Sequence, residues 1–144
     1  LPRISLLIEG NSDPADFFYA GPLLVVSDKL RGVIAGTQME GIEYHALEVR
    51  HKGKILCKHN FYFANICISL DCFDYKKSQY SRDGELIDEI KKLVIDDSKC
   101  QDVNLFRIAR TFDPIVCASK RLCKQIMDSG CKGSVFIKPD QWQW

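Results

Sequence analysis

The chain has 144 residues, of which 46% are hydrophobic and 27% charged, values that are typical of one globular domain and exclude an intrinsically disordered chain. Its 20 basic and 19 acidic residues give a net charge of +1, which excludes the overall positive field of a typical nucleic-acid-binding protein. Because the longest apolar runs are far shorter than the roughly 20 residues that cross a bilayer, the sequence predicts no membrane span.

The seven cysteines are odd in number, and no two of them form a Cys-x-x-Cys pair. Most lie in apolar runs, where a free thiol behaves as a small hydrophobic side chain. We therefore expect a reducing, cytoplasmic setting rather than a disulfide framework. The sequence begins at Leu1-Pro2 without an initiator Met or a signal-like segment, so we expect residues 1–144 to be a single domain that lacks part of its N-terminal segment.

Residues 21–47 predict a strand, a short helix and the start of a second strand. Pro22 opens an apolar run without polar alternation, which is typical of a strand buried on both faces. Ser27 stands where a helix N-cap belongs, and Gly36 can end the helix. An extended segment, residues 42–49, comes next. The helical face that we expect in the core carries Leu30, Val33 and Ile34.

A hairpin is predicted between residues 47 and 68. Its turn is expected at residues 51–54, where Gly53 can take a positive φ, and its apolar return strand includes Phe61. Residues 70–78 then show neither helical nor strand periodicity. This stretch is predicted to be an ordered loop.

The best-marked helix of the sequence is predicted from about Gly84 to Lys92. Ser81 and Asp83 are candidate caps, and the acidic residues lie early and the lysines late, as the helix dipole favours. Its apolar side carries Leu86, Ile87 and Ile90.

The next segment is predicted to be extended with one interruption. Residues 93–95 can begin a strand, which Asp96 and Asp97 interrupt. These two carboxylates suit a turn better than a general acid–base pair. Residues 104–110 then show the alternation of a strand.

The first unit is repeated in residues 113–139. With a displacement of 92 positions the identical pairs are Pro22/Pro114, Ser27/Ser119, Leu30/Leu122, Ile34/Ile126 and Gly41/Gly133. The repeat predicts another strand, a helix that begins at Ser119, buries Met127 and ends at Gly130, and a last strand at residues 134–137. It also aligns three polar or reactive residues with apolar ones, which predicts core positions for His45, Cys117 and Cys131.

The predicted fold class is α+β, a mixed α/β arrangement in one domain. Two similar strand-helix-strand units lie at its ends, and a hairpin plus a helix lie between them.

The sequence contains no glycine-rich phosphate loop, G-x-S-x-G elbow or H-E-x-x-H helix. Cys57 and His59 share a face of a predicted strand, but a nucleophile and its base usually come from separate elements. With His59, Asp71 and Asp74 could form a metal site, although capping or stiffening of the loop is the favoured interpretation. We therefore predict no enzymatic activity, no cofactor and no metal.

Exposed aromatic side chains are the remaining candidates for function. Tyr75, Tyr80, Trp142 and Trp144 lie in polar segments, and exposed aromatics together with Arg are typical of interface hot spots. The loop of residues 71–80 is the predicted partner-binding surface. The residues that we assign to this surface are Asp71, Asp74, Tyr75 and Tyr80.

The order and spacing of several segments add a family resemblance. These segments are LLVVSDKL at residues 23–30, EYHALEV at 43–49, Asn65-Ile66, Leu70-Asp71, DYKKS at 74–78, KLVID at 92–96, NLFRIA at 104–109, residues 116–122, Gly130 and residues 133–136. Together they resemble immunity protein family 11 of bacterial polymorphic toxin systems over most of residues 20–138. The resemblance implies a non-catalytic protein that is made beside a cognate toxin and blocks it by tight binding. It implies no particular set of toxin-contacting residues.

The favoured function is therefore an immunity protein that neutralises a toxin encoded by a neighbouring gene by occluding it. We expect no nucleic-acid or membrane partner, and a homo-oligomer stays open. If the toxin acts on nucleic acid, its basic cleft would attract Asp71 and Asp74. One alternative is a small cytosolic enzyme that uses Cys57 and His59 or the loop carboxylates. Another is a nucleic-acid-binding module that uses the basic cluster of residues 50–59, although such a cluster is more typical of a solvated hairpin tip.

Overall fold

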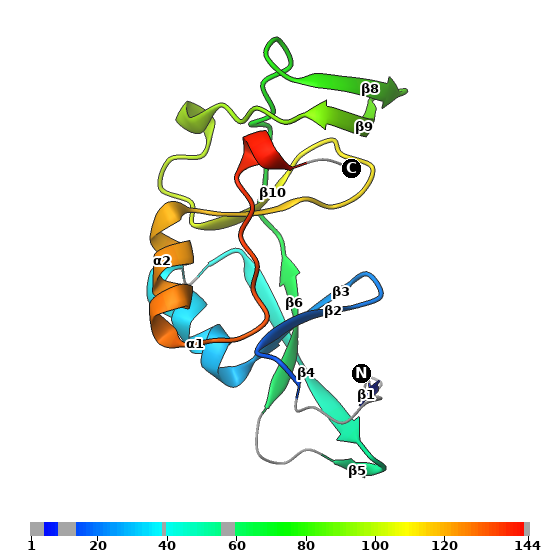
Figure 1. Cartoon of the computed structure of the whole chain (residues 1–144), viewed down its shortest axis with the longest axis vertical. Helices are drawn as coiled ribbons and strands as arrows, with labels where there is room; N and C mark the ends of the chain where they lie inside the picture. Colours follow the sequence, from blue (N-terminus) through cyan, green and yellow to red (C-terminus); the bar gives the residue numbers. More distant parts are fainter. Residues whose placement is uncertain (1–4, 9–13, 39, 56–59, 143–144) are drawn as a thin grey trace.

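The computed structural model describes residues 5–8, 14–38, 40–55 and 60–142. These residues form a mixed α+β arrangement, which confirms the predicted fold class. The described strands form sheets of six, three and two strands. In Figure 1 the largest sheet lies at the lower end of the long axis, the two-stranded hairpin lies at the upper end, and the three-stranded sheet lies between them.

The six-stranded sheet has the order β1-β4-β6-β3-β2, with β5 paired to β4. All of its pairs are antiparallel except β1 with β4. The predicted hairpin is confirmed, because β4 turns at Lys52 and Gly53, both with positive φ, before β5. The longer pairing partner of β4 is β6. The bounds are β1 (Ser5–Ile8), β2 (Phe17–Ala20), β3 (Leu23–Ser27), β4 (Ile42–His51), β5 (Lys54–Ile55) and β6 (Phe61–Ile66).

Strand β3 is buried on both faces, as its continuous apolar run predicts. Leu24 and Val26 belong to the core cluster beneath the helices. Val25 points to the other face, where it packs with Val49 and Phe61. A strand that meets two cores has no solvent side, which is why its sequence shows no polar alternation.

The three-stranded sheet has the order β11-β10-β7. Strand β10 (Leu105–Ile108) confirms the strand predicted over residues 104–110. Strand β7 (Ser69–Leu70) comes two residues after β6 and pairs in parallel with β10. The segment from β6 to β7 thereby connects the six-stranded sheet to the three-stranded sheet. Strand β11 (Val116–Ala118) is antiparallel to β10.

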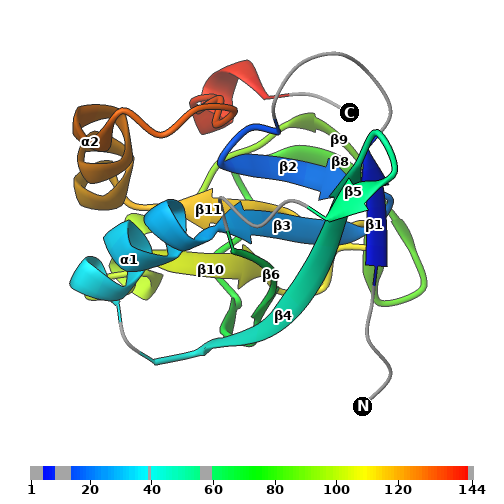
Figure 2. The ribbon, with the colours of Figure 1, turned by 90° about the horizontal axis from the view of Figure 1, so that it is seen from below.

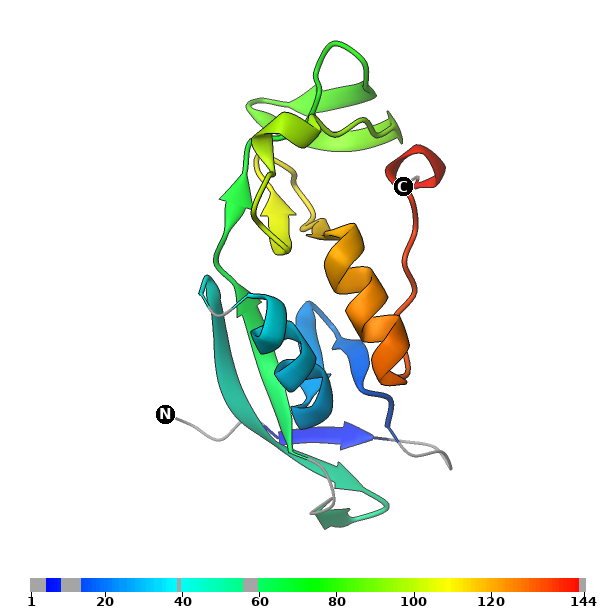
Figure 3. The same cartoon turned by 90° about the vertical axis from the view of Figure 1, so that its left-hand side faces the viewer.

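Helices α1 (Asp28–Thr37) and α2 (Lys120–Ser129) pack against each other on one side of the strands, as Figure 3 shows. Both begin as predicted, because Ser27 Oγ accepts a hydrogen bond from the Leu30 amide and Ser119 Oγ accepts one from the Leu122 amide, each at 3.1 Å. The side chains that these helices bury in the shared core are Leu30, Ile34, Leu122 and Ile126.

The helix ends agree only in part with the sequence. Gly130 ends α2 with a left-handed φ of 75°, as predicted. The predicted role of Gly36 is wrong, since it lies inside α1, which ends at Thr37 with Gln38 as its C-cap. Met127, which the repeat predicts to be in the core, is 66% exposed, because the buried stripe of α2 is only wide enough for Leu122 and Ile126.

The predicted strand-helix-strand order is confirmed in the first unit by β3, α1 and β4, whereas the second unit has β11 and α2 but not the last strand. What the two units share is an additional strand before the predicted one, so that each contains two strands followed by a helix. Strands β2 and β3 precede α1, and β10 and β11 precede α2 (Figure 2). In each unit the N-cap serine bonds to the residue just before the first strand. Ser27 Oγ donates to Asp16 Oδ1 and Ser119 Oγ donates to Asn104 Oδ1, both at 2.7 Å.

The same two side chains also join the units to each other. Asp16 Oδ2 accepts a 2.8 Å hydrogen bond from the amide of Lys132, just beyond α2. Asn104 Nδ2 donates at 3.0 Å to the carbonyl of Thr37, the last residue of α1. The start of each helix therefore lies near the end of the other, so the two helices run antiparallel.

The predicted helix at residues 84–92 is wrong, because this segment forms a hairpin. Strand β8 (Gln79–Asp83) turns at Gly84, which has a φ of 63°, into β9 (Leu86–Lys92). Two register shifts interrupt the pairing, between Gln79 and Tyr80 and between Ser81 and Arg82. A bulge adds a residue to one strand and so interrupts the alternation of side chains between the two faces. Ile87 and Ile90 therefore both face the core although they are three residues apart, a spacing that is typical of a helix. Ser81 and Asp83, the predicted caps, lie in β8.

The last predicted strand, residues 134–137, is also wrong. This segment connects α2 to the short 3₁₀ helix η2 (Pro139–Gln141) and makes no backbone hydrogen bond within the described structure. In the first unit the corresponding stretch is β4, which has β6 and β1 as neighbours. No described strand pairs with residues 134–137, and Val135 is 81% exposed. None of the described helices is long and apolar enough to span a bilayer.

Candidate binding surface

The loop of residues 71–78 is held rigidly against the segment that comes after β9. The Asp74 amide donates to the Val94 carbonyl at 2.9 Å, and the Asp96 amide donates to the Cys72 carbonyl at 2.8 Å. Ser78 is buried, and its hydroxyl bonds to both backbone groups of Val94. These bonds confirm that the loop is ordered, although residues 93–95 pair only through the single bridge between Phe73 and Ile95.

Asp74 shapes the turn at the end of this loop. Its Oδ1 accepts hydrogen bonds from the amides of Lys76 at 3.1 Å and Lys77 at 3.0 Å. An aspartate that bonds to the next backbone amides is a turn former. The stiffening role that the sequence favours for Asp74 is therefore confirmed.

Three aromatic rings pack together where the loop meets the β8–β9 hairpin. Phe73 is fully buried, and its ring lies 5.1 Å from that of Tyr75 and 5.0 Å from that of Tyr80, both edge to face. The two tyrosine rings are 5.8 Å apart and partly exposed. Arg82 covers them, with its guanidinium carbon 4.9 Å from the Tyr75 ring centre and 5.5 Å from that of Tyr80. Cation–π stacking of this kind fixes an otherwise mobile arginine.

Asp71 connects this aromatic group to the β10–β11 loop. Its Oδ1 accepts a 3.1 Å hydrogen bond from the Tyr75 hydroxyl, and its Oδ2 lies 3.7 Å from the Arg110 guanidinium. Arg110 has a φ of 65°, which is uncommon for a residue with a side chain. Its carbonyl accepts a 2.7 Å hydrogen bond from the amide of Ile87 in β9.

Burial raises the pKa of the Tyr75 hydroxyl, and both the hydrogen bond to Asp71 and its negative charge raise it further. The charges of Arg110 and Arg82 oppose this effect. Tyr75 therefore stays neutral at physiological pH and donates a hydrogen bond to Asp71. We call the group formed by Asp71, Asp74, Tyr75, Lys76, Lys77, Tyr80, Arg82 and Arg110 the Tyr75 surface.

The four residues that the sequence assigns to a binding surface are thus brought together, with Phe73 packed beneath the two tyrosines. Sequence reasoning missed Arg82 and Arg110. Arg82 comes two residues after Tyr80, the spacing that places side chains on one face of a strand, so its position carried a signal. Arg110 approaches Asp71 only through tertiary structure.

Four of the described thiols are poor nucleophiles, whereas Cys67 is exposed. Burial raises the pKa of Cys72 to about 11 and that of Cys117 to about 12, and burial also raises the pKa values of Cys100 and Cys123. Because the thiolate is the nucleophile, these groups are unreactive at neutral pH. Cys117 packs against the second core cluster and Cys131 against the first, which agrees with their predicted core positions.

His45 does not lie in the core, contrary to the prediction. It is exposed on β4, where its ring stacks on Phe63 at 5.8 Å and its Nε2 lies 3.7 Å from Glu43. Its alignment with Ile137 is uninformative because residues 134–137 do not form the matching strand. Within the described residues no three His, Cys, Asp or Glu side chains could share a metal ion. Cys57 and His59 lie outside the described residues.

Other predicted polar features are structural. Asp96 caps the 3₁₀ helix η1 (Asp97–Lys99) by accepting from the Ser98 amide and hydroxyl, so the turn prediction is confirmed. Its bonds to Ser98 lower the pKa of Asp96. In the basic cluster, Arg50 pairs with Glu48 at 2.8 Å, while Lys52 and Lys54 are exposed at the β4–β5 turn. Lys58 lies outside the described residues.

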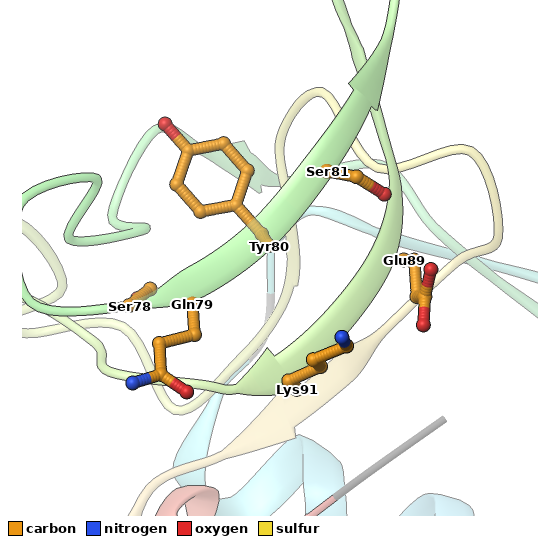
Figure 4. A pocket seen from close by; sticks show the side chains of 6 residues that line it. All are labelled: Ser78, Gln79, Tyr80, Ser81, Glu89 and Lys91. Carbon is orange, nitrogen blue, oxygen red and sulfur yellow. The ribbon is translucent and has the colours of Figure 1, made fainter.

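Two cavities accompany these features. A hollow of about 380 Å³ lies along the β8–β9 hairpin, and Figure 4 shows Glu89 and Lys91 projecting from β9 beside it. A cavity of about 680 Å³ lies between β2, β11, α2 and residues 134–142. The walls of the larger cavity are mainly core side chains, such as Leu24 and Ile126.

These observations define a small α+β domain with an exposed tyrosine–arginine surface. The chain belongs to the immunity protein family (Imm11), whose family model matches residues 7–140. The resemblance seen in the sequence is thereby confirmed, and membership indicates a non-enzymatic immunity function with a toxin as partner. No curated protein matches the chain.

Proposed function

We propose that this protein neutralises one cognate toxin in the cytoplasm by binding it tightly and covering its active site. Family membership supports the immunity role. The observation that carries the binding mechanism is the Tyr75 surface, in which two partly exposed tyrosines and an arginine are held in fixed positions on a rigid loop. Interface hot spots are enriched in Tyr and Arg. Tyr buries a large area at a small cost in conformational entropy, and stacking on two rings already restricts Arg82.

The four residues assigned from the sequence have different parts in this proposal. Tyr75 and Tyr80 make the main contacts. Asp71 orients Tyr75 through their hydrogen bond and lies at the rim, where its side chain is 47% exposed. Asp74 acts indirectly by holding the turn at Lys76 and Lys77. Its replacement would therefore disturb the shape of the surface rather than remove a contact.

The test is co-expression with the toxin encoded by the neighbouring gene. The wild-type chain should restore growth and bind the purified toxin with a dissociation constant of about 1 nM or tighter, which corresponds to about −12 kcal/mol. The double variant Tyr75→Ala/Tyr80→Ala should lose protection, because truncating a central hot-spot residue costs about 2 kcal/mol or more.

Tyr19 provides a matched control, since it is a 56% exposed tyrosine on β2 in the other sheet. Tyr19→Ala should protect as well as the wild type does. If the wild-type chain fails to protect against the neighbouring toxin, the proposed function is wrong. If it protects and only Tyr19→Ala abolishes protection, the docking surface is elsewhere.

A further inference from the structure

We propose that the Tyr75 surface docks on an acidic face of the toxin, and that Arg82 and Arg110 make the charged contacts. This inference rests on the proposed function and adds to it the chemistry of the partner. It differs from the expectation drawn from the sequence, in which the carboxylates of the loop attract a basic cleft. The reason is that the carboxylates of the surface already have partners, whereas its arginines keep free hydrogen-bond donors.

Both carboxylates of the surface already have partners. Asp74 receives two backbone hydrogen bonds from its own turn. Asp71 receives the Tyr75 hydroxyl and lies against the Arg110 guanidinium. A carboxylate with such partners would lose them, or share them, if it turned to a cation of the toxin. Neither group is therefore well placed to recruit a basic cleft.

The Tyr75 surface has more cations than carboxylates, and its arginines keep free hydrogen-bond donors. Its four cations are Lys76, Lys77, Arg82 and Arg110, and its two carboxylates are Asp71 and Asp74. Among the described residues no carboxylate pairs with Arg82, whose guanidinium is fixed by the two tyrosine rings and reaches only the Tyr80 hydroxyl, at 3.4 Å. A guanidinium that stacks on aromatic faces still presents its N–H groups at the edge, in the planar geometry that a carboxylate accepts.

Arg110 is the second arginine of this surface and reaches Tyr75 through Asp71, which contacts both side chains. The positive charges of Arg110 and Arg82 both lower the pKa of the Tyr75 hydroxyl. The Arg110 side chain is 61% exposed, and one ion pair at 3.7 Å leaves most of its five N–H donors available.

The acidic side of the hairpin is separate from these cations. Ser81 Oγ donates to Asp88 Oδ1, and Glu89 pairs with Ser81 across the strands. Figure 4 shows the ring of Tyr80 on the other side of β8 from Gln79, beside which Lys91 and Glu89 line the hollow. Asp88 and Glu89 are therefore associated with Ser81 rather than with Arg82.

The experiment measures the affinity of the full chain for the toxin encoded by the neighbouring gene, by calorimetry at two salt concentrations. Arg82→Glu should weaken binding at least tenfold, and Arg110→Gln should weaken it less, because it removes a charge without reversing it. Arg82→Lys should retain part of the affinity, since it keeps the charge but loses the planar donors. The salt dependence of Arg82→Glu should be smaller than that of the wild type.

Two controls of matched charge change lie elsewhere. Lys124→Glu reverses a 76% exposed cation on α2, and Glu89→Lys reverses a carboxylate of β9 whose cross-strand partner is Ser81. Both should bind within about twofold of the wild type, because neither side chain belongs to the Tyr75 surface and salt weakens longer-range charge effects. Circular dichroism melting should show that every variant is folded.

The sign of the effect decides between the two kinds of partner. Tighter binding by Arg82→Glu, together with weaker binding by Glu89→Lys, would show a basic toxin face and overturn the inference. Wild-type affinity in both arginine variants would overturn it as well, and the proposed function would stand. A wild-type chain that does not bind the toxin at all would instead remove the proposed function itself.

Discussion

The two repeated units begin their helices by the same scheme but continue differently after them. In both, a serine caps the helix and bonds to an acidic or amide side chain before the unit's first strand. Asp16 stands 11 residues before Ser27, whereas Asn104 stands 15 residues before Ser119, so the loop between the two strands differs in length. After α1 the chain enters the ten-residue strand β4, while after α2 it makes an unpaired segment.

This difference separates framework from function. The duplicated parts build one core, because both helices bury their stripes in the same cluster. The Tyr75 surface comes mainly from the unrepeated middle of the chain and packs on a second cluster around Phe73 and Ile90. The two units thus share one core, whereas the proposed binding surface lies over the second cluster, to which the second unit contributes Phe106 and Ile108. Substitutions at aligned positions test how equivalent the two units are.

The largest expected effect is the loss of a central leucine from either helix. Leu30 and Leu122 are aligned and both are completely buried in the shared cluster. Leu30→Ala and Leu122→Ala should each lower the free energy of unfolding by about 3 kcal/mol. Urea denaturation measures both. A difference of more than about 1.5 kcal/mol between them would show that the units contribute unequally to the core.

Replacing the aligned glycines Gly41 and Gly133 by alanine should destabilise the protein to different extents. Gly41 and Gly133 have φ values of 82° and 98°. A Cβ at Gly41 would meet only the side chain of Ile68, which can rotate away. A Cβ at Gly133 would fall on the backbone carbonyl of Phe17 and lie 2.7 Å from Ala15 Cβ.

Gly133→Ala should therefore lower the free energy of unfolding by about 2 to 3 kcal/mol and Gly41→Ala by about 1 kcal/mol, since only the surroundings of Gly41 can relax. Thermal and urea unfolding of the two variants give these values. Gly53→Ala is the control for a positive φ alone, because nothing lies within 4 Å of its Cβ position. Equal costs at Gly133 and Gly53 would mean that the contact with Phe17 is absent.

The sequence predicts those parts of the fold whose signals are local. Ser27 and Ser119 mark both helix starts, and the apolar run at Leu24 marks a strand between two cores. The β8–β9 hairpin escapes prediction because its bulges give Ile87 and Ile90 a helical spacing. The turn consists of Gly84 and Glu85, and a glycine at the first position of a two-residue hairpin turn is a signal that outweighs that periodicity.

For the proposed binding surface, too, the sequence predicts only what local signals indicate. Tyr75 and Tyr80 stand out as aromatics among polar residues, so the sequence indicates where to look. The state of Asp71 depends on Arg110, which is 39 residues away in the chain and meets it only through the packing of β7 beside β10. No local pattern reports such a pairing, so the carboxylates of the loop do not by themselves indicate the sign of the charge that a partner meets.

The smallest expected effect is a difference in stability between variants of the two N-cap serines. Ser27 donates its hydroxyl to the Asp16 carboxylate and is buried, whereas Ser119 donates to the neutral amide of Asn104. Hydrogen bonds to ionised acceptors are roughly twice as strong as neutral ones. Ser27→Ala should therefore cost about 2 kcal/mol and Ser119→Ala about 1 kcal/mol, both measured by urea denaturation.

The variant Asp16→Asn tests the cause by giving the first unit the acceptor of the second. Asp16→Asn should itself destabilise the protein, because its amide group would face the Lys132 amide that now donates to Asp16 Oδ2. In the Asp16→Asn background, however, Ser27→Ala should cost only about 1 kcal/mol, as Ser119→Ala does in the wild type. If Ser27→Ala keeps its full cost there, the asymmetry comes from burial of the Ser27 hydroxyl and not from the charge of Asp16.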